Sequence, residues 1–122
     1  YYKNRLTRSS PCQTSIDPVA IDRNAEIPQS VVDGLGKLGI LGACVPKQYG
    51  GSGFSQVQYC RLIEVVGGHC GSTAIFVNAH HSIGPRAIVL FGTAEQQAKY
   101  LPKLATGDVL RDAVPEFRGE AA

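Results

Sequence analysis

Two helix-start signals constrain the fold of this 122-residue chain more than any other feature of its sequence. Ser55 is followed three positions later by Gln58, and Thr93 is followed in the same way by Gln96. In such a capping box, the hydroxyl oxygen accepts an N–H of the first helical turn, and the glutamine side chain accepts the N–H of the cap residue. The two boxes therefore predict helices that begin directly after Ser55 and Thr93.

A third helix is predicted to start near Pro28. Proline suits the first turn of a helix, where its missing N–H removes no hydrogen bond. Val31, Leu35 and Leu38 then recur at the spacing of one helical face. Gly39 can take the left-handed conformation that ends many helices, so the pattern predicts an amphipathic helix that stops there.

The segment between Gly71 and Gly92 is predicted to be helical as well. Pro85 within it lacks an N–H and is expected to kink the helix or to restart it. No stretch of useful length alternates apolar and polar residues as a half-buried strand would. The sequence therefore predicts an all-α fold, either a helical bundle or the helical part of something larger.

Three glycines, Gly50, Gly51 and Gly53, lie between an apolar run and the helix that follows Ser55, as they would in a phosphate-binding loop. A dinucleotide fingerprint needs a further glycine three positions after Gly53, but Gln56 stands there. The glycines are therefore interpreted as a turn that joins two helices, and nucleotide binding is the weaker alternative.

The composition excludes several classes of protein. A net charge of +2, scattered along the chain, provides no patch for nucleic acid or an anionic membrane, and no apolar run approaches the roughly 20 residues of a transmembrane helix. The four cysteines form no C-x-x-C pair, which favours reduced thiols inside the cell. The chain begins with Tyr1 and contains no methionine, so we expect it to be a fragment.

The adjacent histidines His80 and His81 are the first candidates for a metal site, and His69 next to Cys70 adds to this interpretation. Neighbouring residues of a helix point about 100° apart, so the two rings cannot both bind one ion from a helix. The paired histidines of a zinc-binding helix, four residues apart, are absent. No metal site is predicted.

Four stretches of the chain resemble one protein family in their order and spacing. They are "DRNAEIP" from Asp22, the turn "LGILGACVPKQYGGSG", the helix "AHHSIG" and the stretch "GTAEQQAKYLPKLATG". Together they resemble the N-terminal helical domain of the acyl-CoA dehydrogenases, in the long- and very-long-chain branch where "AH-x-SIG" and "LFGT" recur. The resemblance covers residues 20–107 and implies the helical bundle of that domain.

The resemblance also implies the chemistry of the family. In that family FAD oxidises a fatty acyl-CoA to the trans-2-enoyl-CoA, a glutamate removes the α-proton, and electrons leave to an electron-transfer flavoprotein. The implied parent protein is a homo-oligomer, soluble and intracellular, in the cytoplasm of a bacterium or the mitochondrion of a eukaryote. Its helical domain walls one side of the acyl pocket.

Four residues match positions that line the acyl chain in the family: Phe76, Ala79, His80 and Ile83. They fall on one helical stripe, and a helical stripe is equally well explained as part of the core. Both interpretations stay open. We expect no catalytic residue and no flavin-binding residue in this chain, because the family carries them in segments that have no counterpart here.

Both ends of the chain depart from the family pattern. Pro11 and Pro18 should break the helix that the family has before Asp22. After Gly107 the family continues with a segment like "AFALTEP", whereas this chain reads "DVLRDAVPEFRGEAA".

The departures predict three parts: a divergent segment at 1–19, the helical domain at 20–107 and a divergent tail at 108–122. Such a truncated chain should neither bind FAD nor catalyse the reaction alone. A non-catalytic helical interaction module and the non-functional remnant of a frameshifted gene are the alternatives.

Overall fold

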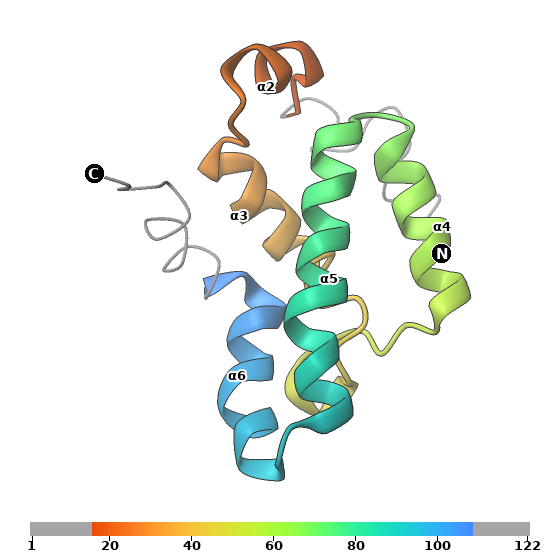
Figure 1. Cartoon of the computed structure of the whole chain (residues 1–122), viewed down its shortest axis with the longest axis vertical. Coiled ribbons are helices and arrows are strands. Elements are labelled where there is room, and N and C mark those ends of the chain that lie inside the picture. The colour runs from red at the N-terminus through yellow and green to blue at the C-terminus, as the bar shows by residue number, and fades with distance from the viewer. Residues whose placement is uncertain (1–15, 109–122) are drawn as a thin grey trace.

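A computed structural model describes residues 16–108, and this part of the chain is all-α, as predicted. Within it, α4 and α6 pack against the long helix α5, α3 packs against α6, and α2 lies across one end of the bundle (Figure 1). The elements are α2 (Pro18–Asn24), α3 (Gln29–Lys37), the short 3-10 helix η1 (Lys47–Tyr49), α4 (Gln56–Gly67), α5 (Gly71–Phe91) and α6 (Ala94–Thr106).

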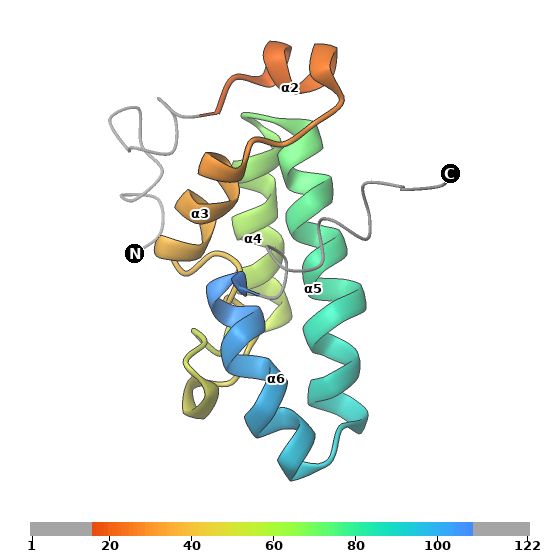
Figure 2. The same ribbon diagram turned by 90° about the vertical axis from the view of Figure 1, so that its left-hand side faces the viewer.

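Helix α5 organises the packing of the bundle. It packs against α4, against α6 and, near its N-terminus, against α2, and the views in Figures 1 and 2 agree that α4 and α6 leave part of its surface uncovered. The larger core cluster joins α2, α3, α4, α5 and the turn after α3, and a smaller one lies under α6. The largest fully buried side chains are Leu35, Ile40, Leu41, Val45, Thr73, Val77, Pro85 and Leu101.

Both predicted capping boxes are present. The backbone N–H of Gln58 donates to Ser55 Oγ at 3.4 Å, and the backbone N–H of Ser55 donates to Gln58 Oε1 at 2.9 Å. The box of Thr93 and Gln96 at the start of α6 has the same two bonds, at 3.3 and 2.9 Å. Each box satisfies two N–H groups that a helix start would otherwise leave without a partner.

Replacing Ser55 by alanine is expected to lower the free energy of unfolding by about 1 kcal/mol, because the alanine side chain cannot accept the amide of Gln58. Chemical denaturation followed by circular dichroism measures the change. Ser72, exposed in the first turn of α5, provides the matched control, and Ser72→Ala should have a smaller effect. Equal effects of the two substitutions would contradict the role of the cap.

The predicted end of α3 is also confirmed. Gly39 has a φ of +73°, in the left-handed region, and its amide donates to the carbonyl of Gly36 at 2.9 Å. Val31 and Leu35 face the core, as the periodicity predicts, and Leu38 is half-buried. The helix itself starts at Gln29, directly after Pro28.

One expectation about proline is wrong. Pro18 was expected to break a helix before Asp22, but it occupies the first position of α2, where Asp17 Oδ1 caps the helix by accepting the amides of Val19 and Ala20 at 3.0 and 3.1 Å. A proline at this position forfeits no intrahelical bond. Pro11 lies outside the described residues.

Pro85 does not restart the second helical segment, because α5 runs unbroken from Gly71 to Phe91. The proline costs the helix one hydrogen bond, since it cannot donate to the carbonyl four residues earlier. Pro85 is fully buried, so its ring adds to the apolar packing of the helix against its neighbours.

The end of α5 is tied to α6 by Gln97. Its Nε2 lies within hydrogen-bond distance of three carbonyl oxygens at the end of α5, those of Ile88 and Val89 at 3.3 Å and that of Gly92 at 3.1 Å. Tyr49 in η1 donates its hydroxyl to Gln97 Oε1 at 3.3 Å. One side chain therefore reaches three carbonyls at the end of α5 and joins three elements.

Candidate functional site

The glycine-rich turn, residues 46–54, uses its own amide groups. Ser52 donates to the carbonyl of Gly42 at 2.9 Å, Gly53 to that of Val45 at 2.9 Å and Phe54 to that of Ala43 at 2.8 Å. The amides of Gly50 and Gly51 likewise donate to carbonyls of residues 46 and 47. A phosphate cradle needs backbone N–H groups that point at the ligand, and here the turn itself employs them. The geometry supports the interpretation as a turn.

Helix α5 carries the four residues expected to line an acyl chain. It is 21 residues long, and Arg86 is its one charged residue when histidine is taken as neutral. Its N-terminus is capped by Cys70, whose Sγ accepts the amide of Thr73 at 3.5 Å. A long helix with so few charges has apolar side chains on more than one side.

The buried side of α5 is held by two histidines that we call the histidine clamp, His80 and His81. Nε2 of His80 lies 3.0 Å from the carbonyl oxygen of Leu41, and Nε2 of His81 lies 2.9 Å from that of Ile40. A carbonyl oxygen can only accept, so both rings carry their proton on Nε2. Each ring thus fastens α5 to the turn that follows α3.

The surroundings of the histidine clamp favour uncharged rings. Burial, with a smaller contribution from His81, lowers the pKa of His80 from its ordinary value of 6.5 to about 4. Burial also lowers the pKa of His81. The Tyr59 ring meets His81 edge-on, with centroids 5.0 Å apart, and donates its hydroxyl to Asn78 Oδ1 at 2.9 Å. Burial raises the pKa of Tyr59 to about 12, so these rings are neutral near pH 7.

The opposite side of α5 is apolar and uncovered within the described residues. Ile75 is 72% exposed, Ile83 76% and Leu90 59%. Ala79 and Ala87 are exposed between them. These five residues, called the open face of α5 below, recur every three to four positions and so form one stripe along the helix.

The structure divides the four predicted residues between the two sides of α5. Ala79 and Ile83 lie on the open face, whereas His80 is buried in the histidine clamp. Phe76 is half-buried and packs against the larger core cluster. The open face also includes Ile75, Ala87 and Leu90, which the prediction did not name, although their spacing continues the same stripe toward both ends of the helix.

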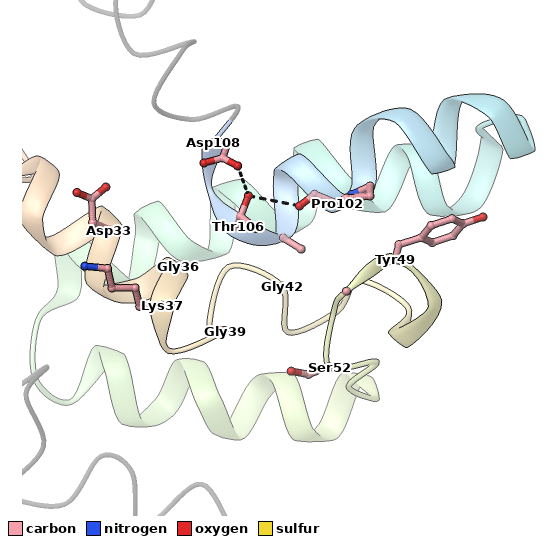
Figure 3. A pocket seen from close by; sticks show the side chains of 12 residues that line it. Asp33, Gly36, Lys37, Gly39, Gly42, Tyr49, Ser52, Pro102, Thr106 and Asp108 are labelled. Atoms are coloured by element: carbon pink, nitrogen blue, oxygen red, sulfur yellow. Dashed lines mark hydrogen bonds between the residues drawn. The ribbon is translucent and has the colours of Figure 1, made fainter.

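A separate hollow of about 560 Å³ lies between α3, the glycine-rich turn and the end of α6 (Figure 3). None of the four predicted residues lines it. Asp33 and Lys37 border it on α3, and Tyr49 on η1. Thr106 and Asp108 border it at the end of α6, where Thr106 Oγ1 donates to Asp108 Oδ2 at 2.7 Å.

These residues do not suit the flavin that the resemblance implies. Two carboxylates face the hollow against one lysine, whereas a dinucleotide cofactor brings a negatively charged pyrophosphate that needs donors and positive charge. We therefore derive no catalytic step through a flavin from these residues.

Within residues 16–108, no three His, Cys, Asp or Glu side chains are grouped so that they could hold a metal ion. None of the helices in this part of the chain is both long and apolar enough to cross a membrane.

Comparisons with known proteins agree on one family. The family model of the acyl-CoA dehydrogenase N-terminal domain matches residues 9–108. The very long-chain specific acyl-CoA dehydrogenase of mitochondria is 45% identical to the chain in Macaca fascicularis and 44% in Homo sapiens, each over 94 residues. A probable acyl-CoA dehydrogenase of Mycobacterium tuberculosis is 41% identical over 96 residues.

The matched region is a small part of each relative. It covers 77% of this chain but 14% of the two mitochondrial proteins, and 78% of this chain but 15% of the mycobacterial one.

Proposed function

The chain belongs to the acyl-CoA dehydrogenase family and matches its N-terminal domain, and from this premise we propose that it serves a flavin-dependent enzyme that oxidises fatty acyl-CoA to trans-2-enoyl-CoA. We propose that the helical domain occupies residues 20–107, which lie within the span 9–108 that the family model matches. The electrons would pass to an electron-transfer flavoprotein, and the parent protein would be a soluble, intracellular homo-oligomer. The names of the relatives support an acyl-CoA substrate.

The proposed role of the chain is to wall the acyl pocket with the open face of α5. The exposed side chains from Ile75 to Leu90 provide an apolar strip about 22 Å long, since each helical residue advances 1.5 Å. An acyl chain presents only methylene groups, and each buried methylene contributes about 0.8 kcal/mol. The open face is therefore the observation that carries the proposal, with Ala79 and Ile83 at its centre and Phe76 at its edge.

The histidine clamp would act from behind this wall. His80 holds α5 against the carbonyl of Leu41 and so fixes how the helix presents Ala79 and Ile83. We propose His80 as a positioning residue rather than one that touches the acyl chain. The FAD would be held by parts of the relatives that lie outside the matched region.

A domain exchange tests this function. Residues 20–107 would replace the matching segment of a very-long-chain acyl-CoA dehydrogenase. We expect the chimaera to be yellow with bound FAD and to oxidise palmitoyl-CoA. The unfused 122-residue chain should be colourless and should not reduce an electron acceptor with palmitoyl-CoA.

In the chimaera, Ile83→Gln should raise the KM for palmitoyl-CoA by at least about tenfold, because a polar group would meet the apolar chain. Val57, which is 73% exposed on α4 and off the open face, provides the matched control, and Val57→Gln should leave the KM unchanged. Equal KM values in the two variants would contradict the wall role. A folded chimaera without FAD would contradict the domain role and favour a non-catalytic interaction module.

A further inference from the structure

The open face of α5 has a residue pattern that is symmetric about Ile83. Alanines stand four positions before it and four positions after it, at Ala79 and Ala87. A large apolar residue, Ile75, stands eight positions before it, and another, Leu90, stands seven positions after it. From Ile83 toward either end, the face therefore presents a small side chain and then a large one.

The apolar surface that this face exposes is large for a single copy. Ile75, Ile83 and Leu90 are 72%, 76% and 59% exposed, and Phe91, beside Leu90 at the end of α5, is 86% exposed. With about 200 Å² for a fully exposed large side chain, these fractions amount to about 600 Å². A monomer rarely exposes a larger contiguous apolar patch. Two such patches would bury about 1,200 Å² together, which is the lower end of specific protein interfaces.

The polar side chains next to the open face have partners of their own. Arg86, the one charged residue of α5, donates to Gln56 Oε1 on α4 at 3.2 Å, so its guanidinium is held toward α4. Ser82 donates its hydroxyl to the carbonyl of Asn78, one turn earlier in the same helix, at 2.8 Å. The face itself carries no charge. An apolar surface could therefore cover it without burying an unpaired charge.

We propose that the chain forms a twofold-symmetric dimer in which the open faces of two copies pack antiparallel against each other. In a twofold interface each contact occurs twice, with the roles of the two copies exchanged. The symmetric pattern satisfies this rule, because Ile83 would meet Ile83 of the second copy and Ala79 would meet its Ala87. The alanines would allow a close approach of the two helices, since the side chains at the contact set the distance between helix axes.

The dimer would use the surface that the proposed function assigns to an acyl chain, so the two uses exclude each other. The inference goes beyond that function, because the dimer needs neither an acyl-CoA nor a flavin. It is tested on the unfused chain without acyl-CoA. A monomeric chain would therefore not count against the activity of the chimaera, and an inactive chimaera would not count against the dimer.

Sedimentation velocity of the full chain between about 1 and 200 μM tests the proposal, because an interface of this size is expected to be of micromolar affinity. The mass should rise from 13.0 kDa to twice that value and stop there, since a twofold interface closes on itself. Ile83→Glu would place two carboxylates against each other and should weaken the dimer at least about tenfold. Val57→Glu, at an exposed position on α4, is the matched control and should leave the dimer unchanged.

An exchange of charges tests the antiparallel register. Ala79→Glu and Ala87→Lys should each weaken the dimer, because each places a charge against an apolar surface. The double variant should restore it, since every introduced carboxylate would meet an introduced ammonium of the second copy. Within one helix the two positions lie eight residues, about 12 Å, apart and cannot pair.

Circular dichroism would establish that each variant is folded. Three results would overturn the proposal: a chain that stays monomeric at 200 μM, a mass that grows beyond two copies, or a folded double variant that dimerises no better than the single ones. Equal effects of Ile83→Glu and Val57→Glu would also overturn it, because the contact would then lie elsewhere.

Discussion

Lowering the pH from about 7 to about 4 is expected to reduce the free energy of unfolding by on the order of 3 kcal/mol through His80 alone. The cause is the histidine clamp, in which two buried rings must stay neutral while each donates from Nε2 to a carbonyl. His81 adds an effect in the same direction, because burial lowers its pKa as well. The total loss of unfolding free energy on acidification should therefore exceed the loss that His80 alone would cause.

The direction follows from the two states of His80. In the unfolded chain the imidazole binds a proton below its ordinary pKa of about 6.5, whereas in the folded chain His80 binds one only near pH 4. Between these values the unfolded chain holds more protons, so acid favours unfolding. Above about pH 6.5 both states are neutral, and the clamp adds no pH dependence.

Urea denaturation at a series of pH values measures this effect, with His80→Gln as the matched variant. Glutamine keeps an N–H donor that can reach toward the carbonyl of Leu41, but it does not titrate. Carboxylates titrate in both proteins and cancel in the comparison. The plot of unfolding free energy against pH should be shallower for the variant between pH 4 and 6.5. Parallel plots would show that His80 does not stay neutral in the folded chain.

Local signals in the sequence predicted much of the fold because they act within one turn of the chain. The capping boxes at Ser55 and Thr93 and the left-handed Gly39 need only neighbouring residues to form, and all three are present. The error at Pro18 has a local cause too. A proline disrupts a helix interior but suits its first position, and the sequence alone did not reveal where the helix begins.

The candidate site was less predictable. Which of its residues are buried and which are exposed depends on contacts with residues far away in the sequence. Phe76, Ala79, His80 and Ile83 share a stripe, yet the stripe does not say which of them meets another part of the chain. His80 lies on the buried side, where the carbonyl of Leu41, 39 positions away, meets its Nε2. No spacing rule predicts such a contact. The role of the four residues at an acyl chain stays a prediction.

Gly51→Ala is expected to lower the free energy of unfolding by about 3 kcal/mol or more, because the turn leaves no room for a side chain. A methyl group on Gly51 would overlap the carbonyl oxygen, carbonyl carbon and Cβ of Val45. Val45 cannot move aside at low cost, since it is fully buried and its carbonyl accepts the amide of Gly53 at 2.9 Å. The glycine is thus required by the close approach of two backbone segments, whatever the turn binds.

Substitutions at two other glycines serve as controls, because they show how replacing glycine by alanine changes stability when no clash occurs. Gly34, inside α3, has nothing within 4 Å of the added carbon, so Gly34→Ala should stabilise the chain by about 0.5–1 kcal/mol through better helix propensity. Gly50 also has open space but a φ of +84°, so Gly50→Ala should cost about 1–2 kcal/mol from backbone strain. Denaturation curves should therefore give the highest free energy of unfolding for Gly34→Ala, a lower one for Gly50→Ala and the lowest for Gly51→Ala. If Gly51→Ala were no worse than Gly50→Ala, the backbone of Val45 would have to yield easily, and the turn would be looser than its hydrogen bonds indicate.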